Sequence, residues 1–562
     1  MKPNSRFNLR ARIGKLCHVA SYKLSQRGAK IFEDSSKQVE ETQRAILQNL
    51  LHSIEGSENA YRFDLEKGND LVDFQKKVPV TDYEDWHTLI EKQQDGEENI
   101  LTKTVCERYQ PTSGSTSKIK WIPYNRDFLD QLDHAISPWM SDLYQQYPEI
   151  KEGRHYWSLS WVPSDLRNKL TASINDDLQL LPWWKALFMA QIMAVPEAVS
   201  LAKTSEESSF ATACYLLACR DLTFISVWSP TFALSLLEMI KQNRYLIQKV
   251  LENGDWLESQ VGLSHLKAPK SQEASQILKQ WDGKINAEFT KKIWPKMVLI
   301  SAWDTSSSEI WARKLAGLFP HSKFQGKGLW ATEGVVSIPY QSHYPLAITS
   351  HFYEFEDLDN KQIYTSWQLK VGQNVRPIIS GANGLLRYGM KDQLKVTGFI
   401  NQCPCLAFIG RLNGVDMVGE KISTEIAVNI INQMSSNGDI SAISLFGLPS
   451  SNINCLPGYA LLCHDENNLS QTQKAVHQAE LSFKLESALC ESFHYKLARE
   501  LGQLDQAQVL IMDNAMEIYT SHKSASGMVE GNIKIEPLVL WQNDNLPTSI
   551  KASHRDALLE WF

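Results

Sequence analysis

This 562-residue sequence has few cysteines, no long uninterrupted apolar run and no strong excess of charge of one sign. The nine cysteines are scattered and do not form the dense framework of a small secreted protein, so we expect a reducing compartment and predict a cytoplasmic location. The formal charge is only -7, which excludes a polybasic nucleic-acid binder and predicts no nucleic-acid partner. A hydrophobic share of 43% excludes a disordered chain, and the length allows several folding units with proper cores.

The most apolar stretch, residues 181–202, is too interrupted to cross a bilayer. It contains Lys185, Gln191, Pro196 and Glu197, whereas a spanning helix needs roughly 20 mostly apolar residues. The sequence therefore predicts no membrane span.

The basic start of the chain carries apolar residues at helical spacing. Leu9, Ile13, Leu16 and Ala20 recur at steps of three or four, and the long apolar segment of a secretory signal does not follow them. This pattern favours an amphipathic helix docked through that face over a membrane-surface or transit element.

Helical and strand-like segments alternate along the rest of the chain. Apolar residues fall at three- and four-residue steps in 39–54 and 232–250, which predicts helices there. Short apolar runs at 224–228, 297–300 and 395–400 are typical of buried strands. The sequence predicts a mixed α/β architecture.

A change of composition at residues 410–414 predicts a domain boundary. Two glycines and an asparagine there separate strand-rich sequence from a shorter segment, which contains a predicted helix at 472–501 and a predicted strand at 508–512. We therefore expect a large N-terminal domain over 1–410 and a small C-terminal domain over 411–562.

One short loop combines hydroxyl groups, a glycine and a lysine. Ser113, Ser115 and Thr116 can donate hydrogen bonds, and Gly114 allows close backbone approach. With the positive charge of Lys120 nearby, the loop can wrap a phosphate. The Gly-Lys-Ser/Thr of a Walker A loop is missing, and a segment of this kind taken alone is more often an ordinary surface turn.

Two later segments each contain a single acid in a setting that suits nucleotide binding. Glu333 lies among small and apolar residues at 324–334, which suits a magnesium ligand, although a solvated turn residue fits the same pattern. Asp392 precedes a predicted strand, where a carboxylate can accept hydrogen bonds from both hydroxyls of a ribose.

The order of these segments along the chain identifies a family more specifically than any one segment does. With this order, the sequence resembles the acyl-adenylating superfamily of firefly luciferase and the acyl-CoA ligases, and more closely the auxin-responsive-promoter family of acyl-acid amido synthetases. Plant members of that family join jasmonate, indole-acetate or benzoates to amino acids. The matching residues extend over nearly the whole chain and include Trp228-Ser229-Pro230-Thr231-Phe232, Gly326-Lys327-Gly328-Leu329, Ala331-Thr332-Glu333, Lys395-Val396-Thr397-Gly398-Phe399, Gly419-Glu420-Lys421-Ile422, Tyr495 with Ala498-Arg499, and Gly531-Asn532-Ile533-Lys534.

The resemblance implies a site for ATP and Mg²⁺ in a large adenylating domain. The residues placed against the ATP phosphates would be Ser113, Gly114, Ser115, Thr116 and Lys120. The residues placed at the α-phosphate would be Ala331, Thr332 and Glu333, with Glu333 also a ligand of the magnesium ion.

The resemblance also implies a smaller, mobile α+β C-terminal domain that rotates about a hinge at 411–414. Asp392 would take the ribose hydroxyls, and Arg411 would lie nearby at the hinge. Lys534 would bridge the substrate carboxylate and the α-phosphate during adenylation.

The implied activity is ATP-dependent ligation of a carboxylic acid to an amine. The acid is first adenylated with release of pyrophosphate, and the acyl group then passes to the amine, for which an amino acid is expected. An alternative is thioester formation on coenzyme A or a carrier protein. A third reading, a degenerate binding homologue, rests on Gly389-Met390-Lys391, which replaces the family's Arg-Leu-Gly before the acid.

Large aromatic rings are concentrated between residues 156 and 232. Such rings suit the walls of a pocket for an apolar or aryl acid, whereas for any single ring packing in the core is the better default. The rings concerned are Trp157, Trp161, Trp183, Trp184, Phe188, Trp228 and Phe232.

Overall fold

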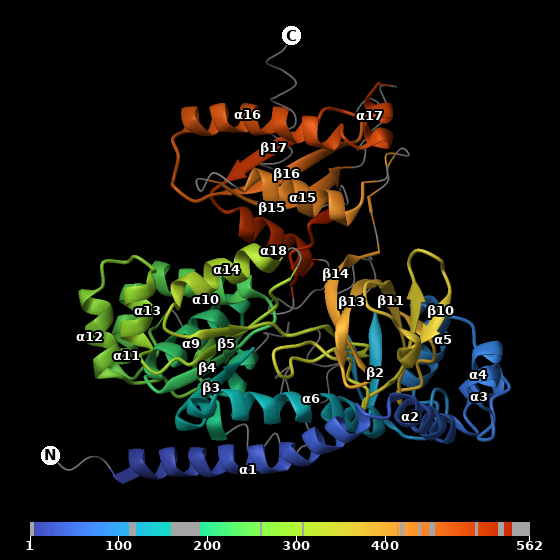
Figure 1. Cartoon of the computed structure of the whole chain (residues 1–562). Helices are drawn as coiled ribbons and strands as arrows, with labels where there is room; N and C mark the ends of the chain where they lie inside the picture. The colour runs from blue at the N-terminus through green and yellow to red at the C-terminus, as the bar shows by residue number, and fades with distance from the viewer. Residues whose placement is uncertain are drawn as a thin grey trace. The chain divides into compact units, whose positions relative to one another are not determined.

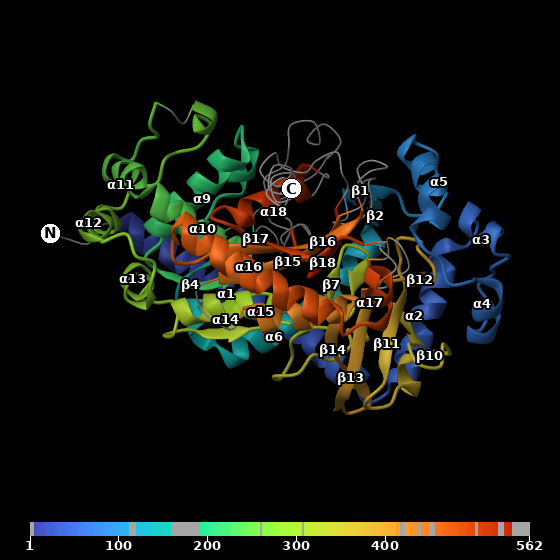
Figure 2. The same ribbon diagram turned by 90° about the horizontal axis from the view of Figure 1, so that it is seen from above.

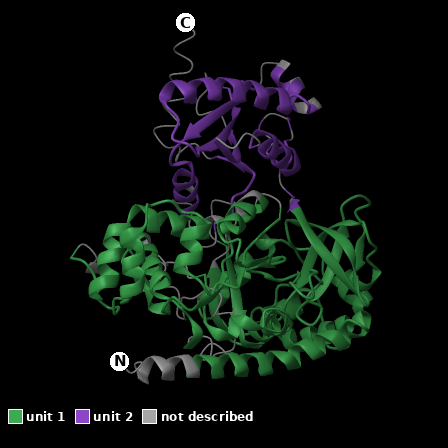
Figure 3. Cartoon of the chain, turned by 60° about the vertical axis from the view of Figure 1, so that its left-hand side comes forward, with its two compact units in different colours: residues 1–409, 529–532 green, residues 410–528, 533–562 purple. Residues whose placement is uncertain are grey.

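The computed structural model describes residues 5–111, 120–158, 191–258, 261–305, 308–412, 414–415, 417, 420, 422–435, 440–448, 456–500, 504–525 and 533–541. These residues divide into two compact units, one up to Ile409 and the other from Gly410 onward (Figure 3). Both units combine sheets with helices, so the prediction of a mixed α/β architecture is confirmed.

Unit 1 contains a parallel four-stranded sheet in the order β3-β4-β5-β6. The strands are β3 (Arg154–Trp157), β4 (Leu222–Ser226), β5 (Leu299–Ser301) and β6 (Lys323–Gln325). The two strands predicted in this region are confirmed, with ends shifted by no more than two residues.

The two faces of this sheet line two different cores, because successive residues of a strand point to opposite faces. Trp157, Ser226 and Ser301 stand in one row, since they are direct partners across neighbouring strands. We call this row and its side the inner face. The row one residue earlier on each strand belongs to the outer face, where a separate apolar core lies.

The helices of unit 1 gather beside its two large sheets. Helices α9–α14 lie around the four-stranded sheet, and α2–α5 lie on the side of the strands β9–β13 (Figure 1, Figure 2). The bounds are α1 (Ser5–Ser35), α2 (Val39–Ile54), α3 (Glu58–Arg62), α4 (Leu71–Lys77), α5 (Tyr83–Gln94), α6 (Arg126–Gln146), α9 (Ser205–Ala218), α10 (Pro230–Gln242), α11 (Arg244–Asn253), α12 (Gln272–Gln280), α13 (Ala287–Ile293) and α14 (Glu309–Leu318).

The second large sheet of unit 1 has six strands in the order β10-β9-β11-β13-β14, with β12 paired to β11. Within the described residues, unit 1 also contains two hairpins, β1 with β2 and β7 with β8. The bounds are β9 (Phe352–Asp357), β10 (Ile363–Thr365), β11 (Asn374–Ser380), β12 (Tyr388–Gly389), β13 (Asp392–Ile400), β14 (Cys403–Arg411), β1 (Cys106–Pro111), β2 (Trp121–Asn125), β7 (Trp330–Ala331) and β8 (Gly334–Val335). The strand predicted at 395–400 forms the end of β13.

The first helix forms as predicted, but it docks through a different face. Ile13 and Leu16 are 41% and 69% exposed, whereas Cys17 and His18 are buried. The reason is a polar anchor: Nδ1 of His18 lies 3.0 Å from the Tyr144 hydroxyl of α6, along which α1 packs. Apolar spacing alone could not reveal this anchor.

Unit 2 is built on a mixed four-stranded sheet in the order β17-β16-β15-β18. Its elements are α15 (Thr424–Met434), β15 (Ile440–Leu448), β16 (Gly458–Asp465), α16 (Gln471–Leu489), α17 (Phe493–Glu500), β17 (Gln508–Met512), α18 (Ala515–Ala525) and β18 (Leu538–Leu540). β17 matches its prediction. In the described part of the chain, no helix combines the length and apolarity needed to span a membrane.

Candidate active site

Thr332 and Glu333 form the tip of the β7–β8 hairpin (residues 330–335). The two strands pair in antiparallel fashion, with Ala331 opposite Gly334, which leaves two residues for the turn. The Tyr124 hydroxyl donates a hydrogen bond of 2.8 Å to the Thr332 carbonyl oxygen. A side chain from β2 thus fixes the main chain of this turn.

His351 holds the other side of the β7–β8 hairpin. Its Nε2 accepts the Val335 backbone N–H at 3.3 Å, and its Nδ1 lies 3.0 Å from Oε1 of Gln131. An amide oxygen only accepts, so Nδ1 carries the proton and donates it. A Cβ atom on Gly334 would lie 2.7 Å from Nε2 of His351, so this close approach requires glycine.

The His351 ring is held in its neutral form. Burial, together with the nearby His134, lowers the pKa of His351 to about 3. Phe128 stacks on the ring, with 5.3 Å between centroids. Since only the neutral ring can accept the hairpin's N–H, burial keeps the support intact at neutral pH.

The Glu333 carboxylate faces a wall of two tyrosines. The Tyr388 hydroxyl lies 3.5 Å from Oε1 of Glu333. Burial raises the pKa of Tyr388 far above its usual value, and the charges of Glu333 and Asp82 raise it further, so the hydroxyl stays protonated. Tyr83 adds to this shift, and the Lys120 ammonium lies 5.2 Å from the centroid of the Tyr83 ring. The structure thus brings Glu333 and Lys120 to one wall.

A buried ion pair fixes the chain immediately before Tyr388. Arg387 has a positive φ of 45°, and its Nε lies 2.8 Å from Oε2 of Glu354. Its Nη1 donates to the Val78 carbonyl oxygen at 2.6 Å. Only 4% of Arg387 and none of Glu354 is exposed, and removing one partner of such a pair destabilises a protein by about 3–5 kcal/mol. Arg387 therefore supports the wall structurally.

Asp392 begins β13 and is 4% exposed. The three residues before it depart from the family pattern, but none of them has a positive φ. Gly389 pairs with β11, Met390 is buried and Lys391 is exposed. The backbone therefore does not need a glycine at position 391, and this turn delivers Asp392 into β13 with the sequence it has.

Part of the sequence-predicted site lies outside the described residues. These positions are Ser113, Gly114, Ser115 and Thr116. Arg411 ends β14, and its side chain also lies outside the description.

Lys534 belongs to unit 2, where its main chain is anchored. Ile533 and Ile535 on either side are each 3% exposed, and the Tyr519 hydroxyl donates to the Lys534 carbonyl oxygen at 3.2 Å. Because Lys534 and Glu333 belong to different units, their meeting in one site stays a prediction.

Two motifs behind the family resemblance hold unit 2 together. The Tyr459 hydroxyl donates to Oε1 of the fully buried Glu420 at 2.6 Å. Tyr495 and Arg499 both bind the Glu486 carboxylate, at 2.9 and 2.6 Å. These residues therefore serve the core of the unit.

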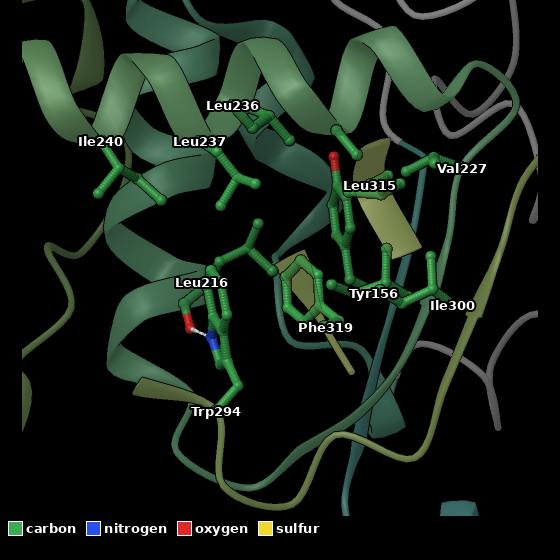
Figure 4. A pocket seen from close by; sticks show the side chains of 12 residues that line it. Tyr156, Leu216, Val227, Leu236, Leu237, Ile240, Trp294, Ile300, Leu315 and Phe319 are labelled. Atoms are coloured by element: carbon green, nitrogen blue, oxygen red, sulfur yellow. Dashed lines mark hydrogen bonds between the residues drawn. The ribbon is translucent and has the colours of Figure 1, made fainter. Parts of the chain in front are cut away.

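An apolar cavity of about 20 Å³ lies at the outer face of the four-stranded sheet (Figure 4). Its walls include Tyr156, Ile225 and Ile300 of the outer face, Leu237 of α10, and Trp294. A cavity of this size holds little more than one water molecule, so it is a packing defect and not a site for an organic acid.

The donor set fits a magnesium ion that arrives with ATP. Among the residues that the structure describes, no group of three or more His, Cys, Asp and Glu side chains could hold a metal ion. Glu333, a single carboxylate at a hairpin tip, suits Mg²⁺, which is commonly held by one or two carboxylates together with substrate phosphates.

The residues that build the wall around Glu333 escaped the sequence analysis. Tyr83, Tyr124, Gln131 and His351 come from four separate segments, and no spacing relates them to one another or to the hairpin. Tyr388 directly precedes the segment Gly389-Met390-Lys391, but that segment did not indicate the contact of Tyr388 with Glu333.

Comparisons with known proteins agree with this architecture. The N-terminal domain of the GH3 family matches residues 28–324, and the central domain of that family matches residues 344–411. The chain is 22% identical over 420 residues to indole-3-acetic acid-amido synthetase GH3.15 of Arabidopsis thaliana, covering 68% of this chain and 69% of the relative. It is 21% identical over 550 residues to 4-substituted benzoates-glutamate ligase GH3.12 of the same plant, covering 88% and 93%.

The fold is also that of a solved member. The structure of the AtGH3.15 acyl acid amido synthetase in complex with 2,4-DB matches with a TM-score of 0.79 and 17% identity, over 94% of this chain and 96% of that one. The matched domains cover more than half of the sequence and this likeness of fold extends over nearly all of it. The chain therefore belongs to the GH3 family.

Proposed function

We propose that this chain is an ATP-dependent acyl-acid amido synthetase that works in the cytoplasm and joins a carboxylic acid to an amine, with an amino acid as the expected acceptor. The observation that supports it best is the pair of tyrosines beside Glu333 in a GH3 chain: protonated Tyr388 lies against the half-buried carboxylate, and the Lys120 ammonium lies over the ring of Tyr83. Asp392 enters β13 four residues after Tyr388, and we assign its carboxylate to the ribose hydroxyls.

The first half-reaction joins two anions. An oxygen of the substrate carboxylate forms a bond to the α-phosphorus of ATP while the bond from that phosphorus to pyrophosphate breaks. Lys120 and the hydroxyl loop would bind the phosphates, and Lys534 would offset the charge that develops between carboxylate and α-phosphate. Mg²⁺, which Glu333 and the phosphates would hold, supplies further positive charge when bound.

The second half-reaction moves the acyl group to nitrogen. The amine nitrogen bonds to the acyl carbon, AMP leaves with the former carboxylate oxygen, and the nitrogen gives up its surplus proton to solvent. Because an acyl-adenylate hydrolyses readily, the intermediate needs protection from water. We propose that residues 411–562 rotate about 411–414 against residues 1–410 between the two half-reactions, which carries Lys534 away from the nucleotide.

The test of the activity is a product analysis. Purified protein receives ATP, magnesium and a panel of aryl, indolyl and fatty acids, with amino acids in one series and coenzyme A in another. Pyrophosphate release followed by an amide of the expected mass supports the proposal. A thioester in the second series identifies the alternative ligase instead, and a protein that fails to bind ATP is a degenerate homologue.

Lys534→Ala tests the rotation separately. We expect the adenylation rate to fall on the order of 10²–10³-fold, because the variant removes a cation from a place where charge concentrates in the transition state. Supplied with acyl-adenylate and amine, the same variant should form amide at nearly the parent rate. Equal damage to both half-reactions, or to neither, contradicts the assigned rotation.

A further inference from the structure

A buried lysine lies at the carboxyl end of the four-stranded sheet, on its inner face. Lys327 follows β6, is 3% exposed, and donates a hydrogen bond of 2.7 Å to the Ser226 hydroxyl. The same ammonium lies 4.6 Å from the ring centroid of Trp228 and 5.3 Å from that of Trp139. Aromatic ring faces and a hydroxyl oxygen stabilise a buried cation, so these contacts offset the cost of burying the Lys327 ammonium.

Two further indoles pack against the two rings that contact this lysine. Trp330 lies 5.3 Å from Trp139 and 5.5 Å from Trp228, measured between ring centroids. Trp157 lies 5.8 Å from Trp139. We call the resulting group the tryptophan chamber, which comprises Lys327, Ser226, Ser301, Trp139, Trp157, Trp228 and Trp330.

The tryptophan chamber contains polar groups that call for an acceptor. Within the described ranges, Nε1 of Trp157, Nε1 of Trp330 and Oγ of Ser301 have no hydrogen-bond partner. These residues are 2%, 8% and 0% exposed. An indole N–H can only donate, and buried polar groups are nearly always paired in folded proteins. A guest that carries acceptor oxygens would satisfy them.

The position of the tryptophan chamber suits one end of a substrate. Parallel sheets bind ligands beyond the carboxyl ends of their strands, which is where β4 and β5 place Ser226 and Ser301. Trp330 belongs to β7, so the chamber adjoins the hairpin whose tip carries Glu333. Glu333 itself faces Tyr388 of the six-stranded sheet, so the two polar groups belong to different walls.

We propose that the tryptophan chamber binds the non-reacting end of the acid substrate, and that Lys327 selects planar acids with a second anionic or carbonyl oxygen at that end. The proposal rests on the proposed function, because that function assigns the reacting carboxylate to the hairpin side. The four indoles supply flat apolar contact for a ring, and the ammonium with its neighbouring donors supplies the selectivity.

The test uses pairs of acids that differ only in a second carboxylate. Suitable pairs are benzoate with terephthalate, and phenylacetate with 4-carboxyphenylacetate. Their dissociation constants are measured by calorimetry on the full chain, with and without magnesium and a non-hydrolysable ATP analogue. We expect the dicarboxylate of at least one pair to bind about tenfold or more tightly than its partner, as a charged hydrogen bond provides. Lys327→Met should reduce that preference to less than about threefold.

Two other variants complete the design. Lys323→Met is the matched control, because this lysine is exposed on the same strand that leads to Lys327, and it should keep the full preference. Ser301→Ala removes one unpaired donor with little change in volume, and it should reduce the preference by about threefold. This variant carries the test if Lys327→Met does not fold.

Three results would overturn the proposal. In the first, the wild type binds both acids of every pair equally well. In the second, Lys327→Met keeps the preference for the dicarboxylate. In the third, Lys327→Met weakens the binding of both acids of a pair equally. The last result would place the reacting carboxylate itself at Lys327. Since binding is scored without turnover, a failure of this proposal is distinguishable from the absence of pyrophosphate and amide, which would count against the proposed function.

Discussion

The two faces of the four-stranded sheet differ in chemistry although they are only one residue apart along each strand. On the outer face, Ile225 and Ile300 line a small apolar cavity. On the inner face, Ser226 and Ser301 stand beside indoles and a buried ammonium. The apolar cavity thus belongs to the packing of a core, whereas the polar face adjoins the β7–β8 hairpin.

This difference indicates that neighbouring residues of one strand, which point to opposite faces, can contribute separately to stability and to function. We expect changes on the outer face to alter the free energy of unfolding with little effect on catalysis per folded molecule. Changes of the half-buried polar side chains at the hairpin tip should alter catalysis with little effect on unfolding.

The largest expected effect is on the outer face. Leu237→Ala enlarges an existing cavity and removes buried methyl groups, so the free energy of unfolding should fall by about 2–5 kcal/mol. Urea titration measures this loss, with the exposed Leu246→Ala of α11 as control. A loss of pyrophosphate release per folded molecule would break the separation between the two faces.

Glu333→Gln should reduce catalysis and leave the free energy of unfolding unchanged, the reverse of Leu237→Ala. The amide keeps the size of the side chain but loses the anionic oxygen that a hard cation prefers, so pyrophosphate release should fall on the order of 10²–10³-fold, comparable with other losses of transition-state stabilisation. The exposed Glu288→Gln serves as control, and both variants should unfold like the parent. Parent-like turnover across a magnesium titration would remove Glu333 from the metal site.

Asp392→Ala should weaken ATP binding without preventing folding. Each strong charge-assisted hydrogen bond to a ribose hydroxyl contributes about 1.5–3 kcal/mol, and calorimetry with ATP measures the loss. An unchanged affinity in a folded variant would show that this carboxylate does not bind the ribose and would favour the reading of the segment as degenerate.

His18→Gln tests the part of the sheet that α1 contacts, where the ring centroids of His18 and of His155 on β3 lie 4.6 Å apart. Burial lowers the pKa of His18 to about 4 from its ordinary 6.5, so the unfolded chain takes up a proton before the folded one does. The free energy of unfolding should therefore fall as pH decreases from about 6.5 to 4, by about 1.4 kcal/mol per pH unit for this group.

Replacing His18 should remove that share of the slope in urea titrations at pH 7, 6 and 5, with pyrophosphate release at pH 7 unchanged. If the slope stays as in the parent, His18 is not the group that titrates. If activity falls as well, the contact between α1 and β3 also influences the site.

The sequence predicted local elements better than it predicted contacts. The helix at 39–54 and the strand at 508–512 form with the expected bounds, because their apolar spacing and their burial agree. The helix expected at 232–250 divides at Asn243, and the one expected at 472–501 divides after Leu489. Apolar spacing continues across both breaks, so periodicity alone could not indicate them.

For the candidate site too, the sequence indicated segments but not the contacts between them. The acids at 333 and 392 stand in recognisable segments, but the side chains that hold them in place come from distant parts of the chain. Lys327 is only one residue of a motif in the sequence, and its place beside Trp139 and Trp228 depends on α6 and on the loop that follows β4. No local pattern encodes such a meeting.

The central claim is that a carboxylate of the acid becomes bonded to the α-phosphorus of ATP before an amide forms. An acid labelled with heavy oxygen in its carboxylate tests this directly when it is incubated with ATP, magnesium and an amino acid. The account predicts that each AMP acquires one labelled oxygen while the amide keeps the other, as mass spectrometry would show. Unlabelled AMP, or ADP with labelled inorganic phosphate, would contradict it.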